Sequence, residues 1–167
     1  MKVFKEEQRF KQTWLIILLT VSIFASVAVI TQEYLEENSK MTTNEFVLTL
    51  IGITISVAFI FFFKLKTRID EKGIHYQFAP FHFKLKVVAW TSIEKATVRT
   101  YDPIGEYGGW GLKGGFLWSK EKGSCITISN DIGIQLLLKN GKKLLIGTQK
   151  KEEAIQILKT YKGKLNE

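Results

Sequence analysis

Two long stretches without a charged side chain constrain this chain more than any other feature. Residues 14–30 and 46–63 are apolar runs of 17 and 18 residues, and all 24 Lys/Arg and all 16 Asp/Glu lie outside them. As helices, the runs would each extend about 26–27 Å, close to the ~30 Å hydrocarbon core of a bilayer. This distribution excludes a disordered chain. A disulfide scaffold is excluded because Cys125 is the only cysteine and cannot form an internal bridge. It predicts transmembrane helices at residues 13–31 and 46–64.

Two other interpretations of the runs stay open. The core helix of a soluble protein can be equally apolar all round. Residues 1–30 could also form a cleavable signal peptide, because the start is basic and Ser26-Val27-Ala28 is a small-residue cleavage site. The first run continues past that site to Ile30, and a second run follows closely, which favours a helical hairpin. Neither run contains Asp, Glu, Lys, Arg or His, which argues against a transporter or proton relay.

The cations flanking the runs predict their orientation. Four precede the first run, one lies in the 32–45 connection and four follow the second run: Lys2, Lys5, Arg9 and Lys11, then Lys40, then Lys64, Lys66, Arg68 and Lys72. Because Lys and Arg concentrate on the cytoplasmic side, we expect a bacterial inner-membrane protein with both termini in the cytoplasm. Residues 1–12 would then be a cytoplasmic segment and residues 32–45 a short external loop. Thr42-Thr43-Asn44-Glu45 predicts a capping box before the second helix.

Residues 65–167 form the predicted cytoplasmic domain, with 18 Lys/Arg against 10 Asp/Glu. Alternating apolar and polar residues on both sides of Ala79-Pro80 predict a β-hairpin with a two-residue turn there. One face would be apolar (Ile74, Tyr76, Phe78, Phe81, Phe83, Leu85, Val87) and the other polar (His75, Gln77, His82, Lys84, Lys86). Further strands are predicted at 95–101, 124–129, 132–139 and 142–147, the last two joined by an Asn140-Gly141 turn.

A helix is predicted at the end of the domain. In residues 149–162, Ala154, Ile157, Leu158 and Tyr161 recur at helical spacing. This helix would cover the last hairpin, which is apolar on both faces. We therefore expect an α+β fold in which a two-helix transmembrane hairpin precedes six or seven antiparallel strands. The strands would form a bent sandwich or partly open barrel closed by the C-terminal helix.

Strands followed by one closing helix resemble the bacterial pleckstrin-homology-like (PH-like) domain. The segments that carry the resemblance are Tyr101–Gly111 and Leu137–Gln149, the second of which contains the Gly-turned final hairpin. The whole chain, over roughly residues 10–165, resembles small uncharacterised bacterial membrane proteins with two spans and a domain of this type. The resemblance implies the fold and a membrane setting, and it implies no catalytic residues.

Residues 102–123 hold seven of the thirteen glycines of the chain, interleaved with aromatic residues. One interpretation is an architectural loop whose aromatic rings fold back onto the sheet. The other is a partly exposed surface for a protein partner, with Tyr107, Trp110 and Trp118 as anchors and Glu106 and Lys113 as polar contacts. Gly109–Gly114 matches G-x-G-x-x-G, but no helical pattern follows it, which argues against a nucleotide site.

A second candidate surface is basic. We expect that cations on the strands could contact anionic lipid headgroups: Lys64, Lys66, Arg68, Lys84, Lys86, Lys142 and Lys143. Two histidines, His75 and His82, are too few for a metal site without further ligands. Cys125 lies in an apolar strand and is typical of a small buried hydrophobe. We predict no catalytic residue, no metal and no cofactor.

The sequence favours a membrane-anchored, non-enzymatic interaction module. The 102–118 loop or an exposed sheet edge would dock a protein partner near the inner leaflet. The alternative is a sensor of anionic lipid or a small ligand that uses the basic strands. Small residues in the spans also allow a homo-oligomer. No nucleic acid partner is expected, because no binding motif accompanies the positive charge.

Overall fold

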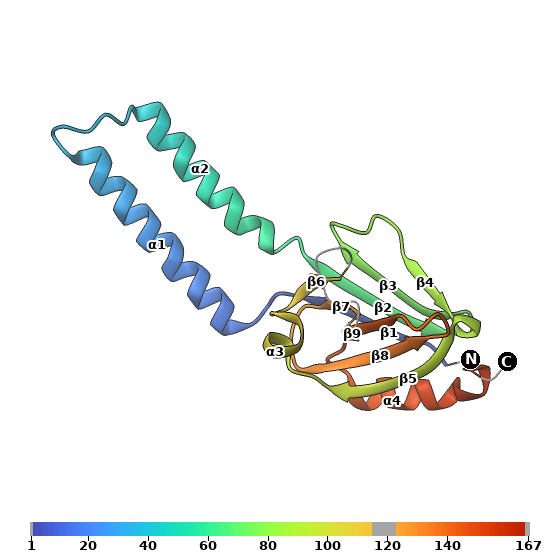
Figure 1. Cartoon of the computed structure of the whole chain (residues 1–167). Coiled ribbons are helices and arrows are strands. Elements are labelled where there is room, and N and C mark those ends of the chain that lie inside the picture. Colours follow the sequence, from blue (N-terminus) through green and yellow to red (C-terminus); the bar gives the residue numbers. More distant parts are fainter. Residues whose placement is uncertain (1, 115–122, 166–167) are drawn as a thin grey trace. The chain divides into compact units, whose positions relative to one another are not determined.

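The computed structural model describes residues 2–114 and 123–165, and the chain divides into two compact units (Figure 1). One unit is the segment Phe10–Phe62, which holds two helices. The other is a β domain that combines the residues up to Arg9 with those from Phe63 onward. The helical unit is therefore an insertion into the β domain rather than a segment that precedes it.

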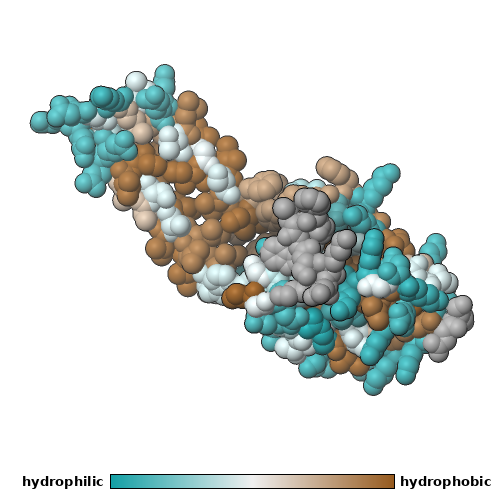
Figure 2. Space-filling model, viewed as in Figure 1, coloured by the Kyte–Doolittle hydropathy of each residue, from teal (hydrophilic) through white to brown (hydrophobic). Residues whose placement is uncertain are grey.

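The helical unit is a hairpin of α1 (Thr13–Leu35) and α2 (Thr43–Ile60). Both helices are long and apolar enough to cross a membrane, and neither contains a buried residue. Figure 2 shows their visible surface as largely hydrophobic, with hydrophilic side chains at the end that carries the connection. Two apolar helices at the predicted places are therefore confirmed.

Local hydrogen bonds define the ends of the hairpin. The predicted capping box is present: Glu45 N–H donates to Thr42 Oγ1 over 3.3 Å, and Thr42 N–H donates to Glu45 Oε2 over 2.8 Å. Across the connection, the ring of Tyr34 stacks on Phe46 with 4.5 Å between ring centroids. Within the helices, hydroxyl groups donate to the carbonyl four residues earlier, which satisfies them without water: Thr20, Thr49, Thr54 and Ser56.

The first sheet has four antiparallel strands in the order β1 (Phe4–Arg9), β2 (Lys64–Asp70), β3 (Gly73–Ala79) and β4 (Lys86–Ala89). The sequence pattern predicts neither β1 nor β2; β1 lies within the predicted N-terminal segment 1–12. Arg9 is the register partner of Lys64, so the chain leaves the sheet and returns to it at the same end of two neighbouring strands.

The second sheet has five strands in the order β5-β8-β9-β7-β6. Their bounds are β5 (Ile93–Thr100), β6 (Gly111–Lys113), β7 (Ser124–Thr127), β8 (Ile132–Leu138) and β9 (Lys143–Gly147). The predicted strands in this half of the domain are confirmed, and Gly141 takes a positive φ in the predicted turn between β8 and β9. However, β7 runs parallel to β9, so this sheet is mixed, and the sheets do not close into a barrel.

Helical segments complete the β domain. They are η1 (Trp90–Ser92), α3 (Pro103–Tyr107), α4 (Lys151–Thr160) and η2 (Lys162–Leu165). The predicted C-terminal helix is confirmed as α4, which buries Ala154, Ile157 and Leu158 on the face that the periodicity indicated. The α+β class is therefore confirmed.

A hydrogen bond from Gln8 Nε2 on β1 to the Gly147 carbonyl of β9 (2.8 Å) connects the first sheet to the second. Phe4, Glu6 and Gln8 are buried, and the intervening residues are exposed. The Glu6 carboxylate accepts hydrogen bonds from the Thr148 hydroxyl (2.6 Å) and from the Gln149 N–H (2.7 Å), just before α4. Because a buried charge is tolerated only when it is paired or hydrogen-bonded, these bonds make β1 an integral strand of the domain.

The two-residue turn predicted at Ala79-Pro80 is wrong, although β3 and β4 do pair as an antiparallel hairpin. Phe78 would oppose Phe81 across a two-residue turn, but β4 begins only at Lys86, whose register partner is Tyr76. The backbone of residues 80–85 bonds instead to polar side chains and to the end of β3. Gln77 Nε2 donates to the carbonyls of His82 (3.0 Å) and Phe83 (3.2 Å), and His82 N–H donates to the Phe78 carbonyl (2.8 Å).

Candidate functional site

The segment after β5 places the ring of Tyr107 in the core of the domain. Asp102 caps α3 by accepting a hydrogen bond from the Ile104 N–H at 3.0 Å, and Gly108 ends the helix with a φ of 67°. This short helix places Tyr107 in the core, where it is 2% exposed and meets the Tyr101 ring edge-on. Burial also raises the pKa of the Tyr107 phenol. The predicted exposure of Tyr107 is therefore wrong, and the ring instead packs under the segment.

Glu106 is an internal ion-pair partner. Its carboxylate accepts two hydrogen bonds from the Arg99 guanidinium, at 3.0 and 2.6 Å, and one from the Asp102 N–H at 2.9 Å. The hydrogen bond to Glu106 raises the pKa of Arg99 above its usual value. A bidentate pair of this kind fixes α3 on β5, so Glu106 already has a structural role in the domain.

The other residues predicted for this surface divide into three cases. Trp110 is partly exposed, and its indole N–H donates to the Asn130 carbonyl at 2.9 Å. Lys113 ends β6 and is partly exposed. Trp118 lies outside the described residues. The structure therefore does not assemble the five predicted residues into one exposed surface.

The loop between β3 and β4 turns its aromatic side chains outward instead. Phe83 is 92% exposed and Phe81 is 57% exposed, although the alternating pattern predicts both on the apolar face of a hairpin. Leu85 and Val87 are exposed as well. Exposed large apolar residues gathered in one place mark interaction surfaces far more often than single scattered ones do. We call residues 80–85 the outward loop.

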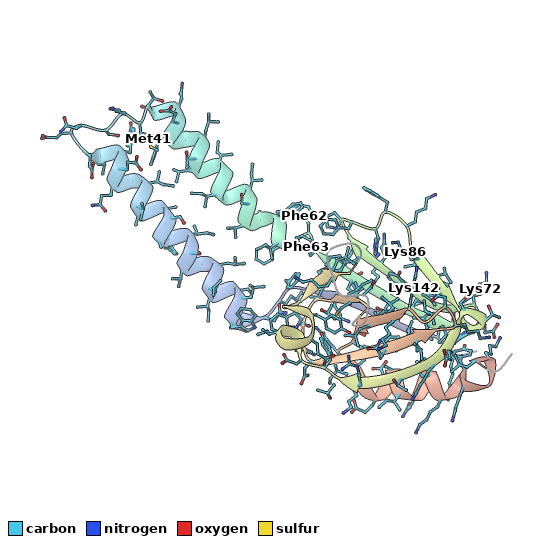
Figure 3. The ribbon with its side chains drawn as sticks, in the orientation of Figure 1. Met41, Phe62, Phe63, Lys72, Lys86 and Lys142 are labelled. Carbon is cyan, nitrogen blue, oxygen red and sulfur yellow. The ribbon has the colours of Figure 1, made fainter. Side chains whose placement is uncertain are left out.

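The outward loop lies at the end of the sheet where the chain enters from α2. Ala79, which precedes the loop, is the register partner of Lys64, the first residue of β2. Phe63 comes just before β2, and its ring lies 5.8 Å from the rings of both Phe78 and Phe81. Figure 3 places Phe63 and Lys72 at opposite ends of β2. The aromatic side chains of the loop thus lie at the Phe63 end.

A cationic face lies on β1 and β2. Lys64, Lys66 and Arg68 alternate with buried residues along β2, and opposite them on β1 lie Arg9, Glu7 and Lys5. Five of these six side chains are cations. Glu7 forms ion pairs with Arg9 (3.0 Å) and Lys64 (3.6 Å), and it approaches Lys66 at 4.0 Å. An open hollow of about 550 Å³ on this face is lined by cations, two carboxylates and two further residues: Lys5, Lys66, Arg68, Glu6, Glu7, Thr67 and Leu85.

The remaining predicted headgroup contacts are spread over the domain. Lys84 is an exposed residue of the outward loop. Lys86 is the register partner of Tyr76, so the two side chains lie on the same face of the sheet and His75 lies on the other. The prediction that Lys86 and His75 share a face is therefore wrong. Lys142 and Lys143 are exposed at the β8–β9 hairpin, and Figure 3 shows Lys142 toward the Lys72 end of the domain. The structure brings the β2 cations together with Lys5 and Arg9, which the strand patterns did not reveal.

A buried carboxylate supports the far end of this sheet. The Asp70 carboxylate is hydrogen-bonded to His75 Nε2 (2.9 Å) and forms an ion pair with Arg68 through Nε (2.9 Å). It also accepts a hydrogen bond from the Lys72 N–H (2.9 Å). Burial acts to raise the pKa of Asp70, but the hydrogen bonds from His75 and Lys72 and the charge of Arg68 outweigh it and hold the pKa below its usual value. His75, predicted as exposed, is therefore buried as the partner of Asp70.

The single cysteine of the chain lies in the core of the β domain. Cys125 is buried as predicted, and burial raises the pKa of its thiol to about 12. Within residues 2–114 and 123–165 there is no group of three or more His, Cys, Asp or Glu side chains that could hold a metal ion. No family model matches the chain, and no curated protein matches it either.

Proposed function

We propose that this protein is a membrane-anchored, non-enzymatic module whose β domain contacts the anionic lipid surface of the membrane that anchors it. The observation that carries the proposal is the outward loop, with Phe83 92% exposed directly before the exposed cation Lys84. Aromatic residues beside cations are the usual composition of segments that enter the headgroup region of a bilayer. In this proposal α1 and α2 cross the inner membrane and both termini are cytoplasmic.

The strand order supports a hairpin that crosses the membrane twice. Because β1 and β2 pair in one sheet, the chain before α1 and the chain after α2 must lie on the same side of any membrane. Two crossings satisfy this condition and one crossing does not. A signal peptide cleaved after Ala28 would also separate β1 from the domain that it completes. The count of flanking cations assigns that common side to the cytoplasm.

The short connections support contact with the same membrane. Three residues, Phe10 to Gln12, separate β1 from α1, and three, Phe61 to Phe63, separate α2 from β2. At about 3.3–3.6 Å per extended residue, neither connection can exceed roughly 15 Å. The Lys64 end of the sheet, with the outward loop beside it, is thereby tethered close to the bilayer. Each of its cations would contribute about 1 kcal/mol near an anionic surface.

The domain is proposed to be PH-like, because its strands are followed by one closing helix. Protein docking through residues 102–118, which the sequence favours, has weaker support as a proposal, since Tyr107 is buried and Glu106 is paired with Arg99. Trp110 keeps some exposure and is the residue on which that second proposal depends. An Ala substitution at Trp110 that abolished capture of a purified partner would favour docking over lipid contact.

A fluorescent label at position 83 tests the proposal. The full-length Phe83→Cys variant is labelled with an environment-sensitive dye and reconstituted in nanodiscs of phosphatidylcholine alone or with phosphatidylglycerol. Native Cys125 is fully buried, and burial raises the pKa of its thiol, so the dye reacts preferentially with the introduced, exposed cysteine. We expect a blue-shifted, brighter emission in the anionic nanodiscs, reversed by high salt.

Two matched controls make the result decisive. Glu71→Cys carries the dye at an exposed position in the turn between β2 and β3, at the opposite end of β2 from Phe63, and its emission should not depend on lipid charge. Replacing Lys64 and Lys66 with Gln should weaken the response at position 83 roughly tenfold, whereas replacing Lys142 and Lys143 should change it little. Equal emission from position 83 in both kinds of nanodisc would contradict the proposal.

A further inference from the structure

A groove between β5 and α4 is the strongest feature of the domain that lipid contact does not use. In the order of the second sheet, β5 is the terminal strand and has β8 as its neighbour within the described residues. Figure 1 shows α4 running along β5. Between the strand and the helix lies a groove of about 530 Å³, within the ~300–1,000 Å³ range of ligand pockets.

The backbone of β5 presents hydrogen-bonding groups to this groove. Along an antiparallel strand, the backbone N–H and C=O groups of successive residues point alternately toward the neighbouring strand and away from it. The Tyr101 N–H donates to the Asp131 carbonyl at 2.7 Å, so the backbone groups of Tyr101 point toward the chain of β8. By the register, Arg99 and Thr97 point toward β8, and the N–H and C=O groups of Ala96 and Val98 point away from it. An extended segment could therefore pair with the outer edge of β5.

The floor of the groove is apolar. Ala96 and Val98 contribute from β5, and Ile155 and Leu158 from α4, with Leu165 at the end of η2. Side chains of an added strand point alternately to its two faces. Every second residue of a bound segment would therefore meet apolar side chains, which favours a strand with small or β-branched hydrophobic residues at those places.

The charged residues at the rim define the chemistry of the remaining positions. Lys95 on β5, Lys159 on α4 and Lys162 on η2 line the groove against one carboxylate, Glu94. The rim has a net charge of +2 from these four side chains at neutral pH. A segment whose polar positions are Asp or Glu therefore complements the rim, whereas a basic segment is repelled by it.

We infer that the β5–α4 groove binds an extended, acidic segment of a partner protein by β-strand addition. The backbone of the segment pairs with Ala96 and Val98, alternate apolar side chains cover the apolar residues of the groove, and the carboxylates at the remaining positions are attracted by the net positive charge of the rim. Main-chain pairing supplies affinity in this mode of recognition, and the alternate side chains supply specificity. The inference does not depend on contact between the outward loop and lipid.

Binding of designed peptides to the full-length protein tests the inference. The probe is an eight-residue peptide of alternating valine and glutamate, as long as β5, with a fluorescent dye at one end. Its anisotropy is followed during titration with the protein in a non-ionic detergent. We expect saturable binding of this peptide and at least about tenfold weaker binding of a peptide of alternating valine and lysine. Equal binding of the two peptides would overturn the inference.

Substitutions in the groove locate the binding site. Ala96→Pro removes an outward N–H on an edge strand, where proline is tolerated, and should abolish binding. Ala96→Val keeps the N–H and serves as the control, with affinity within about twofold of the native protein. The double change Lys159→Glu and Lys162→Glu alters exposed side chains without disturbing the fold, and it should weaken binding at least tenfold.

Three further results would overturn the inference. One is unchanged affinity in the Lys159→Glu, Lys162→Glu variant, while Lys151→Glu on the same helix controls for overall charge. A second is unchanged affinity in a folded Ala96→Pro variant. The third is a concentration-dependent dimer that Ala96→Pro converts to a monomer in sedimentation, because the groove edge would then pair with a second copy of this chain.

Discussion

The β domain contains two segments rich in aromatic residues, and they have opposite arrangements. Residues 102–113, interrupted by glycines, bury Tyr107 and bind Glu106 to Arg99. Residues 80–85, which read as a strand, expose Phe81 and Phe83. Glycine content and apolar alternation would have assigned the two roles the other way round. The contrast shows that the burial of an aromatic side chain depends on the tertiary contacts that its segment makes, not on the local pattern alone.

The hydrogen bonds of each segment explain the difference. The inward segment follows β5 directly, and its short helix closes on Arg99 through two charge-assisted hydrogen bonds. The outward loop is joined to the end of β3 by the side chains of Gln77 and His82, which bond to the backbone of the loop and of the strand, and not by strand pairing. Its aromatic rings therefore remain near the surface.

The largest effect that we expect comes from removing the strand on which the first sheet begins. Deleting residues 2–9 eliminates the buried Phe4 side chain and the hydrogen bonds of Glu6, and should cost about 5 kcal/mol or more. That is comparable with the whole stability of many domains. Hydrogen exchange should show loss of protection in β2 to β4, the remaining strands of the first sheet. A Lys5→Ala variant, changed on the exposed face, should retain protection.

The next effect separates the two segments directly. Tyr107→Ala should lower the free energy of unfolding by about 3–5 kcal/mol, because it leaves a cavity beside Tyr101 and Cys125. Phe83→Ala should change it by less than about 0.5 kcal/mol, since that side chain is almost fully exposed. Chemical denaturation of the full-length protein, followed by near-ultraviolet circular dichroism, measures both. Similar losses in the two variants would refute the contrast between the segments.

A smaller effect is expected at the ion pair of the inward segment. Glu106→Gln keeps the shape of the side chain but removes its charge, and it should cost no more than about 1 kcal/mol because both partners are partly exposed. The loss should shrink at high salt. Thermal unfolding at low and high ionic strength provides the measurement. A salt-independent loss would show that the carboxylate acts through its hydrogen bonds alone.

The smallest effect concerns the base of the outward loop and depends on pH. Burial, with the charge of Lys86, lowers the pKa of His82, and its unprotonated Nδ1 accepts the Phe78 N–H at 3.2 Å. The closed loop therefore binds the proton less readily than the open loop. Its stability is present above the ordinary histidine pKa of about 6.5 and is lost as the pH falls below that value.

Amide exchange at Phe78 measures this opening between pH 7 and pH 5, after correction for the intrinsic pH dependence of exchange. Protection should decrease more at Phe78 than at Tyr107, whose ring packs in the core against Tyr101. A His82→Asn variant can keep an acceptor that does not titrate, and it should remove the pH dependence. Persistence of the dependence in that variant would contradict the role of His82.

The local sequence determined those elements that are stabilised by residues only a few positions apart in the chain. The two apolar runs predict α1 and α2, the Thr42–Glu45 pair predicts a capping box, and Asn140-Gly141 predicts the β8–β9 turn. The spacing of Ala154, Ile157 and Leu158 predicts α4. Each of these signals depends on residues within a few positions of one another, where helix periodicity and turn geometry act directly.

Only the tertiary structure determined the elements that depend on distant partners. The sequence Phe4–Arg9 has no apolar alternation, and it becomes a strand because β2 pairs with it and residues 148 and 149 bond to Glu6 across more than 140 positions. The same holds for the parallel pairing of β7 with β9 and for the groove beside β5. Pairing and burial are properties of the folded chain, so no local pattern contains them.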